Sequence, residues 1–578
     1  MKQIKNKTII ALLTISFLMS WSCTDLEEDV LDESLTGSGQ SEAVSGSIAP
    51  AYGLLPQTFR HTRYFGLQLI PSDEAILPAR GGDQWYDGGK FIEVHTHNIT
   101  PSNGLVGETW DYLTTNISRT LLAIETLTPL AETDSEAASA LYEMKALRAY
   151  LNMLMLDSWG LVFKKESAAE TSEVLRGQEA IAYIKSEFLA VVDVINTDKG
   201  PGRMTQAAVW GFLAKLHLNA AVYRDPYGTP DFTTEDMNKV IEYTDNIINS
   251  GQFALSPEYF DLFNDDNHDN PELIFALDQR GILNNDHSRW AYWSMSGSLF
   301  PRPEYPDADG TDGPAITPDF YQTWVDAYGD TDPAEADARF YQKNVEVPEE
   351  LKDLTGFSPQ NDENRYICVA AEDFEIDRGI LRGTPWGPRK DADGNFYTCD
   401  GGYRIYALGE RREADMEYYV DHTLEIDFTA NNGYASGYRV SKYQFSHTSD
   451  DGNNYSSVDL VLLRYAEIYM MRAEARLRNG DNAGALADVN TVRTSRTARE
   501  PVPEALTSIN LDIMYRERGF EFYWEMSRRT DMIRFGHYED SWTEKTDSNV
   551  NHRLFPVPQS AIDGASNTPG YLEQNPGY

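Results

Sequence analysis

The chain has 578 residues, of which 41% are hydrophobic, so it is long enough to bury a large core. Its 91 acidic residues outnumber 49 Lys and Arg, and the formal net charge of −42 makes nucleic acid a poor partner. The charge mildly disfavours polyanionic ligands, although a local basic pocket could override it. The three cysteines exclude a disulfide framework. Cys368 and Cys399 form either one bridge or two buried thiols.

The N-terminus has the features of an export signal. Lysines precede an apolar run over residues 9–19, which is too short to span a bilayer and is typical of a signal peptide over 1–22. The motif SWSC resembles a lipobox, although it lacks the usual Leu three residues before the Cys, and predicts lipidation of Cys23. Residues 23–47 are polar and acidic, as expected for a flexible tether. The alternative is a secreted protein in which Cys23 has no such role.

The N-terminal part of the body, about 48–250, shows apolar residues at helical spacing. Consecutive segments of this kind predict antiparallel helical hairpins. The predicted helices span 110–127, 141–154, 179–194, 206–223 and 236–248.

Periodicity is lost over about 278–455, where Gly, Pro, Asp and aromatic residues dominate. Short strand-like pieces occur there, for example over 438–445. A long irregular region inside a globular chain is usually functional, which favours a loop-rich insert displayed on a helical scaffold.

Helical spacing resumes at Asp459, over the stretch 459–493. Asn479-Gly480 separates two alanine-rich helical patterns, as in the repeat unit of a tetratricopeptide-like scaffold. The predicted apolar stripes are Leu463, Ala466, Met470, Ala473 and Leu477 in the first half, and Ala485, Leu486, Val489 and Val492 in the second.

Three C-terminal segments resemble the SusD/RagB family, the outer-membrane nutrient-binding lipoproteins of Bacteroidetes-type bacteria. They are LLRYAEIYMMRAEARLRNG (462–480), RERGFEFYWEMSRRTDMIRFG (516–536), and LFPVPQSAI (554–562) with a terminal QNPGY. The resemblance implies a mainly α fold, a tetratricopeptide-like helical hairpin scaffold with a loop-rich insert containing short strands. It also implies one SusD-like domain over 48–578, whose C-terminal helical part covers about 459–578.

The resemblance further implies a protein of the outer membrane, lipid-anchored and facing the cell exterior. Such a protein captures an oligosaccharide or polysaccharide and delivers it to a SusC-like TonB-dependent outer-membrane barrel. The acidic charge favours a neutral glycan. A peptide-binding, RagB-like lid remains an alternative, and a glycan-active enzyme a remote one, because HExxH, G-x-S-x-G and P-loop motifs are absent from the sequence.

Aromatic clusters with polar neighbours are the candidate ligand site, because ring faces stack on the C–H face of a sugar while polar groups bind its hydroxyls. In the family this site comes from an N-terminal loop and from loops of the insert. By order along the chain, the candidate residues are Asp83, Trp85, Trp290, Trp293, Arg382 and Trp386. The alternative is that each Trp packs in the core, and that Arg382 and Trp386 have a structural role.

Metal binding has weaker support, and we predict no cofactor. His95 and His97 alternate as in a strand, so both imidazoles would share a face, but a third ligand is missing. Acidic loops over 265–269, 307–310 and 391–395 offer oxygen ligands, yet the last has Phe396 and Gly402 where an EF-hand needs Gly and Glu. A structural calcium stays open, since some family members carry one.

The segment 516–536 combines charge with aromatics but is interpreted as scaffold. Its aromatic residues fit a buried helical face, and its charged residues fit bracing ion pairs. The residues concerned are Phe520, Trp524 and Phe535 for the face, and Glu517, Glu521, Arg528 and Asp531 for the pairs.

Overall fold

The computed structural model describes residues 38–81, 83–280, 290–301, 308–410, 417–429, 433–446 and 457–578. The predicted signal peptide and Cys23 lie outside these ranges. The chain divides into two compact units, 1–46 and 47–578, and the larger one is described below. None of the described helices combines the length and apolar composition needed to cross a bilayer.

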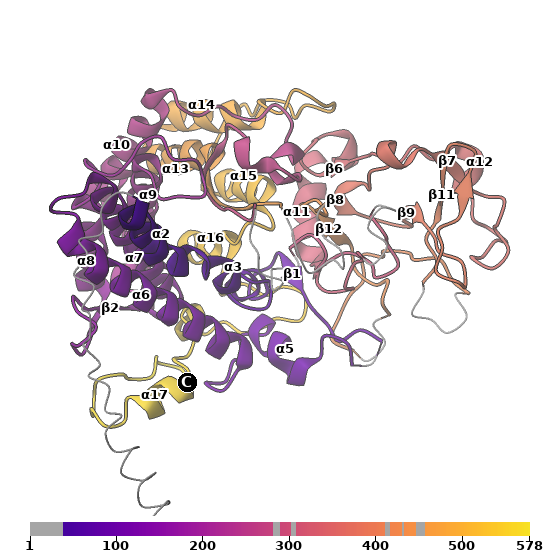
Figure 1. The fold of residues 1–578 in the computed structure, drawn as a ribbon. Helices are drawn as coiled ribbons and strands as arrows, with labels where there is room; N and C mark the ends of the chain where they lie inside the picture. Colours follow the sequence, from indigo (N-terminus) through magenta and orange to yellow (C-terminus); the bar gives the residue numbers. More distant parts are fainter. Residues whose placement is uncertain are drawn as a thin grey trace, which may run out of the picture. The chain divides into compact units, whose positions relative to one another are not determined.

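Helical hairpins form the N-terminal part, as predicted (Figure 1). Helices α6 and α7 pack together, as do α9 and α10. Asn103 and Asp134 cap α6 and α7, each accepting hydrogen bonds from two backbone N–H groups of the first turn. The helices here are α2 (Ser38–Tyr52), α3 (Leu55–Thr58), α4 (Tyr64–Leu69), α5 (Lys90–His95), α6 (Gly104–Leu130), α7 (Ser135–Trp159), α8 (Gly177–Leu189), α9 (Gln206–Arg224) and α10 (Thr234–Ser250).

The C-terminal part contributes α13 (Tyr465–Arg478), α14 (Asn482–Arg493), α15 (Leu511–Phe522), α16 (Arg528–Phe535) and α17 (Gln559–Gly564). The predicted hairpin over 459–493 is confirmed as α13 and α14, with Ala466, Met470 and Val489 in its core. Leu463, however, lies in strand β13 (Leu460–Arg464), which pairs antiparallel with β4 (Leu273–Leu277). The run LVLLR is buried throughout, and a short fully apolar run does not distinguish strand from helix.

Short strands and loops form the insert, as predicted. Strands β12, β8 and β6 form one sheet, and β10, β11, β7 and β9 another, which lies far from α6–α10 in Figure 1. Their bounds are β6 (Tyr341–Gln342), β7 (Ile367–Val369), β8 (Arg378–Leu381), β9 (Trp386–Pro388), β10 (Thr398–Cys399), β11 (Gly402–Ala407) and β12 (Arg439–Ser441). Small two-stranded pairs complete the fold: β1 (Ala75–Ile76) with β5 (Ala315–Ile316), and β2 (Leu161–Lys164) with β3 (Glu173–Arg176).

Two features of the insert go beyond the sequence prediction. Helix α11 (Pro318–Tyr328) forms where no helix was expected, because Thr317 caps it, Pro318 starts it, and Phe320 and Trp324 are buried. Cys368 and Cys399 form a disulfide, with Cα atoms 6.0 Å apart, which decides between the two alternatives.

The segment 516–536 is scaffold, as interpreted. Phe520 and Trp524 are buried, although Trp524 follows the end of α15 with a φ of 62° rather than lying on the helix. Each predicted ion-pair residue is paired, mostly with distant parts of the chain. The pairs are Glu517 with Arg339 and Arg493, Glu521 with Arg339, Arg464 and Arg496, Arg528 with Asp73, and Asp531 with Arg518 and Arg534.

One buried carboxylate makes a specific acid sensitivity testable. Burial raises the pKa of Glu474, but Arg534, which binds it at 2.8 and 2.9 Å, and Arg478 outweigh burial and lower the pKa from 4.5 to about 2. A carboxyl group whose pKa is lower in the folded than in the unfolded state stabilises the fold at pH values above the unfolded pKa. For Glu474 this stabilisation is about 3 kcal/mol, and it is lost as the pH falls from 4.5 to 2. The Glu474→Gln variant, measured by thermal unfolding, is therefore expected to lie well below the wild type at pH 7 and to approach it at pH 3.

The control for this prediction is Glu346→Gln, because Glu346 is an exposed partner of Lys343. Its unfolding temperature is expected to follow the wild type at every pH. A gap between Glu474→Gln and wild type that stays constant from pH 7 to pH 3 would contradict the prediction.

Candidate ligand-binding site

The loop that carries Asp83 and Trp85 is a tight turn closed by its own backbone. Arg80 and Gln84 exchange N–H···O bonds of 2.8 and 3.0 Å. Trp85 adopts a φ of 63°, and its indole N–H donates to the Thr311 carbonyl at 2.7 Å. The Trp85 side chain is half-buried, while Asp83 and Tyr86 are exposed. Part of the Trp85 side chain and two polar side chains of the same loop therefore reach solvent.

The Trp85 ring rests on other aromatic rings. Its centroid lies 6.1 Å from that of Trp293 and 6.1 Å from that of Phe91. Trp293 is 0% exposed and Trp290 is 3% exposed, with the Trp290 indole N–H donating to the Phe59 carbonyl at 3.1 Å. This burial favours the alternative that both rings pack in the core over direct contact with a ligand. They belong to the core, and Trp293 supports Trp85 from below.

Two buried arginines fasten this loop to the insert. Arg80 and Arg439 both donate to the carbonyl of Gly313, at 3.1 and 3.0 Å. Arg80 also donates to the Ser436 carbonyl at 2.7 Å. Burial lowers the pKa of Arg439 to about 10. The described residues of segments 80–81, 83–89, 290–301, 308–313 and 433–439 are thereby held together.

Sequence reasoning missed Arg80 and Arg439, because a single arginine in a loop or at the start of a short strand carries no pattern. The only signal was Gly81, in the RGGD run. Its φ is 53°, and a Cβ there would lie 2.1 Å from the Tyr434 hydroxyl, so a glycine is required where the two loops meet.

Arg382 and Trp386 form a second group. Both line a pocket of about 60 Å³, with Trp386 half-buried on β9. Arg382 is held by Asp332 at 2.9 Å and by the Tyr321 hydroxyl at 3.1 Å. His422, in the same pocket, hydrogen-bonds the Ala435 carbonyl through Nδ1 at 3.0 Å. The segment 433–439 therefore contacts both groups of candidate residues.

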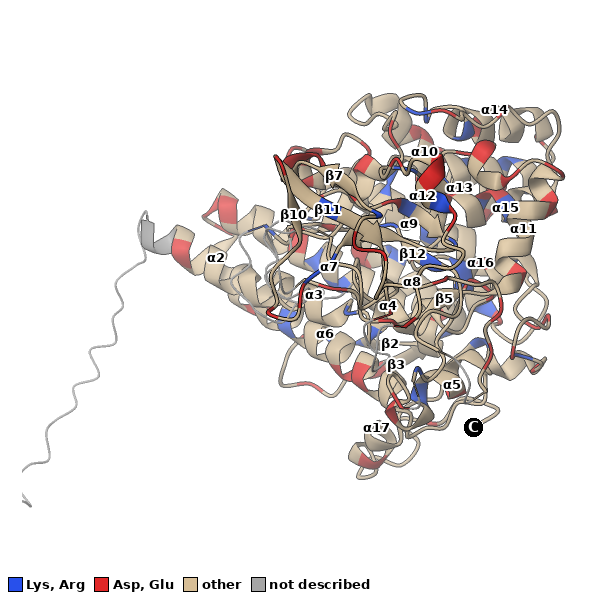
Figure 2. Cartoon of the chain, turned by 90° about the vertical axis from the view of Figure 1, so that its right-hand side faces the viewer, with Lys and Arg blue, Asp and Glu red and all other residues tan. Residues whose placement is uncertain are grey.

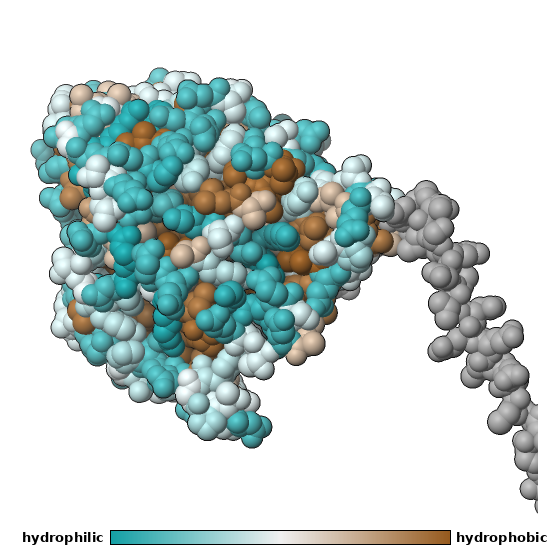
Figure 3. Space-filling view, turned by 90° about the vertical axis from the view of Figure 1, so that its left-hand side faces the viewer, coloured by the Kyte–Doolittle hydropathy of each residue, from teal (hydrophilic) through white to brown (hydrophobic). Residues whose placement is uncertain are grey.

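A larger groove of about 570 Å³ lies between α6, β2 and the C-terminal segment. It is on the helical part of the molecule, and Figure 3 shows a side of that part where apolar patches alternate with polar surface. Its lining is mostly apolar and includes Ile117, Leu121 and Leu122. Its hydrogen-bonding side chains include those of Thr114, Ser118, Arg148, Lys165, Ser172 and Tyr571, and among the described residues no carboxylate or carboxamide lines it.

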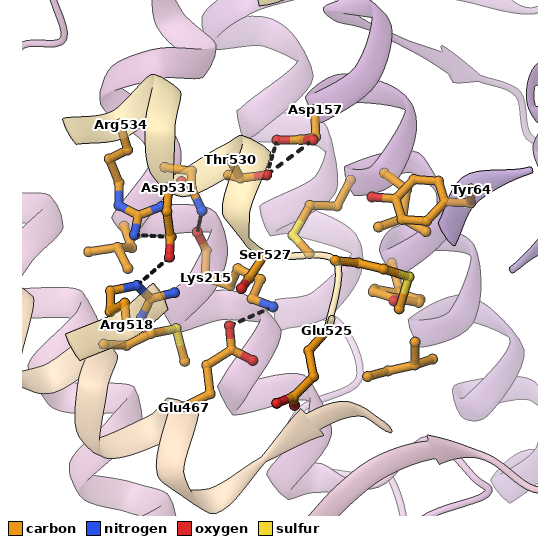
Figure 4. Close-up of a pocket in the computed structure, with 18 of the residues that line it drawn as sticks. Tyr64, Asp157, Lys215, Glu467, Arg518, Glu525, Ser527, Thr530, Asp531 and Arg534 are labelled. Carbon is orange, nitrogen blue, oxygen red and sulfur yellow. Dashed lines mark hydrogen bonds and ion pairs between the residues drawn. The ribbon is translucent and has the colours of Figure 1, made fainter. Parts of the chain in front are cut away.

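The interior of the helical scaffold contains a polar pocket of about 70 Å³ (Figure 4). Lys215 binds Glu467 at 2.7 Å, and Asp531 binds Arg518 and Arg534 at 2.7 and 2.6 Å. Its charged side chains already pair with one another.

The two histidines do not form a metal site. His95 ends helix α5 and His97 follows it, so the predicted strand is wrong. The His95 ring lies within hydrogen-bonding distance of the carbonyls of Ala75 and Thr543, and the His97 ring of that of Pro71. Burial lowers the pKa of both rings. Two buried imidazoles whose ring nitrogens contact backbone carbonyls have a structural role.

The acidic loops give no firmer evidence of a cation. Asp391 accepts hydrogen bonds from the backbone of its own turn, and Asp307 lies outside the described residues. His268, Asp278 and Asp459 have ligand-type atoms within 4.8 Å of one another. Their atoms are already hydrogen-bonded, His268 to Asp459 at 2.6 Å and Asp278 to Arg280. A structural calcium therefore stays a hypothesis.

Comparison with known proteins agrees with this architecture. In sequence, the starch-binding protein SusD of Bacteroides thetaiotaomicron is 25% identical over 467 residues, which cover 77% of this chain and 74% of that protein. In fold, the chain is similar to a laminarin-binding SusD-like protein, with a TM-score of 0.61, 17% identity and coverage of 93% of this chain and 99% of that one.

A second solved structure is the surface glycan-binding protein A of Bacteroides thetaiotaomicron in complex with laminarihexaose. Its TM-score is 0.61, with 18% identity and coverage of 92% of this chain and 99% of that one. A model described as the SusD family matches residues 229–578, which is more than half of the sequence. The chain belongs to the SusD family.

Proposed function

We propose that this protein is a surface glycan-binding protein that captures an oligosaccharide or polysaccharide. The observation that carries the proposal is the half-buried Trp85 ring beside exposed Asp83 and Tyr86, on a base fixed by Arg80 and Trp293. The similarity to the starch-binding protein SusD supports the ligand class.

Binding at this site rests on two kinds of contact. The Trp85 ring stacks on the C–H face of a sugar ring, and the Asp83 carboxylate accepts hydrogen bonds from hydroxyls. A loop closed by its own backbone hydrogen bonds loses less conformational entropy when the ligand binds. The net charge of −42 favours a neutral glycan.

In its wider role the protein captures the glycan without making or breaking a covalent bond. The protein delivers the glycan to a SusC-like TonB-dependent barrel in the outer membrane, and a lipid on Cys23 anchors it there, facing the exterior. The relatives are named as binding proteins, which supports a binding protein over an enzyme. In the second group, Arg382 and Trp386 contribute further contacts to the same ligand.

Affinity electrophoresis of the full chain in detergent tests this proposal, with gels that contain neutral and acidic polysaccharides. One neutral glycan is expected to retard the chain. Trp85→Ala should weaken this retention roughly tenfold, because a stacked aromatic ring is lost. The matched control is Tyr418→Ala, which removes an exposed aromatic side chain elsewhere in the insert.

The other outcomes separate the alternatives. Retention that Trp85→Ala leaves unchanged would contradict the site but keep the function. Retardation by no glycan, together with binding of an oligopeptide mixture, would favour the peptide-binding alternative. Release of reducing ends from a glycan would instead indicate an enzyme.

A further inference from the structure

The outer sheet of the insert carries a cluster of tyrosines on one face. Arg404 lies opposite Cys368 in β7, and Gly402 lies opposite Cys399 in β10. Two positions further along each ladder, the same register places Tyr366 opposite Tyr406 and Tyr397 opposite Arg404. Because side chains alternate along a strand, these residues share one face, and Ile405, which is buried, faces the other way.

The ring geometry confirms this register. The Tyr406 centroid is 5.7 Å from that of Tyr366 and 5.8 Å from that of Tyr397, with planes tilted by 53° and 70°. The Arg404 guanidinium lies 4.4 Å from the Tyr366 centroid. Tyr406 is buried beneath them, so Tyr366, Tyr397 and Arg404 form a shallow tyrosine platform.

The platform is exposed, and a disulfide braces the strands that carry it. Tyr397 is 42% exposed and Tyr366 is half-buried. Each of these tyrosines precedes by two residues a cysteine of the Cys368–Cys399 disulfide, which ties together the strands on both sides of β11. Rigid aromatic side chains bind with little loss of conformational entropy.

The chemistry of this face favours a neutral, hydroxyl-rich ligand. Its side chains are tyrosine rings, a guanidinium and a disulfide, and no aliphatic residue stands at these positions. Within the described part of the chain, the hydroxyls of Tyr366 and Tyr397 have no hydrogen-bond partner. Exposed acidic residues, among them Glu363 and Asp400, lie next to the strands and disfavour an anionic ligand (Figure 2).

We propose that the tyrosine platform is a second glycan-binding site, separate from the Trp85 loop, which stacks sugar rings of a neutral polysaccharide. The proposal rests on the glycan-binding function proposed above and adds a second point of contact. Two sites joined by one polysaccharide chain bind with an increased effective concentration, so long chains should be retained more strongly than short ones.

The experiment is affinity electrophoresis of the full chain in detergent against the retarding polysaccharide, with Tyr366→Ala, Tyr397→Ala and Trp85→Ala. Each tyrosine variant is expected to weaken retention about threefold to tenfold. A double variant of Trp85 and Tyr397 should abolish it. Tyr418→Ala is the matched control, because Tyr418 is 66% exposed in the same insert and makes no ring contact with the platform in the described residues.

The experiment distinguishes failure of the tyrosine platform from failure of the proposed glycan-binding function. If Trp85→Ala weakens retention while both tyrosine variants equal the wild type, the platform is overturned and glycan binding stands. If the tyrosine variants change only the sedimentation of the chain, the face is a protein contact and the proposal is overturned. If no glycan retards the unaltered chain, both proposals fail. Unchanged circular dichroism and melting of each variant exclude misfolding as the cause.

Discussion

Replacing Glu521 with glutamine is expected to lower the free energy of unfolding by about 3–5 kcal/mol, the usual cost of breaking a buried ion pair. The Glu521 carboxylate binds Arg496 at 2.6 Å, Arg464 at 2.7 Å and Arg339 at 3.1 Å, and all four side chains are buried. Burial raises the pKa of Glu521, but these three guanidinium groups outweigh it and hold the pKa well below its usual range. With a neutral amide at position 521, the positive charges of the three buried guanidinium groups are no longer balanced by this carboxylate.

The change is measured as the shift of the urea midpoint at pH 7. The matched control is Glu349→Gln, since Glu349 pairs with Lys352 on the surface and an exposed pair contributes at most about 1 kcal/mol. Equal shifts for the two variants would contradict the role assigned to Glu521. The three arginines come from the insert, β13 and the segment after α14, so the destabilisation should affect the whole domain at once.

The helical scaffold could be predicted because its signals are local. The apolar spacing that predicts α6, α7, α9 and α10 lies within each contiguous segment, and the Asn479-Gly480 turn separates α13 from α14. The sequence also predicted that Glu521 forms ion pairs, because it lies on a helix with a buried aromatic face. Its partners could not be predicted, because Arg339 and Arg464 are brought to it only by the tertiary fold.

The site could be predicted only in part. The sequence pointed to Trp85, Trp290 and Trp293 alike, since all three stand among Gly, Asp and Arg. Only packing distinguishes them: Trp85 is half-buried, while the other two are core residues. The turn that presents Trp85 depends on Arg80 and Gly313, which are 233 residues apart. No periodicity or motif records a contact of that separation.

A Trp293→Ala variant is expected to weaken glycan retention although Trp293 is fully buried. The ring contacts Trp85, Phe65 and Phe91, and its removal leaves a cavity that costs about 3–5 kcal/mol. Because Trp85 then loses the ring beneath it, its position is no longer fixed, and retention by the neutral glycan should fall at least threefold in protein that is still folded.

The matched control separates this effect from lost stability. Trp324 is also fully buried, and its ring stacks on Phe520 at 3.7 Å rather than on any residue of the Trp85 loop. Trp324→Ala should therefore lower the melting temperature about as much as Trp293→Ala while leaving retention at the wild-type level. If both variants lose retention equally at a temperature where each is folded, the proposal that Trp293 positions Trp85 is contradicted. If only Trp293→Ala loses retention, Trp293 does not contact the ligand itself but acts by holding Trp85 in position.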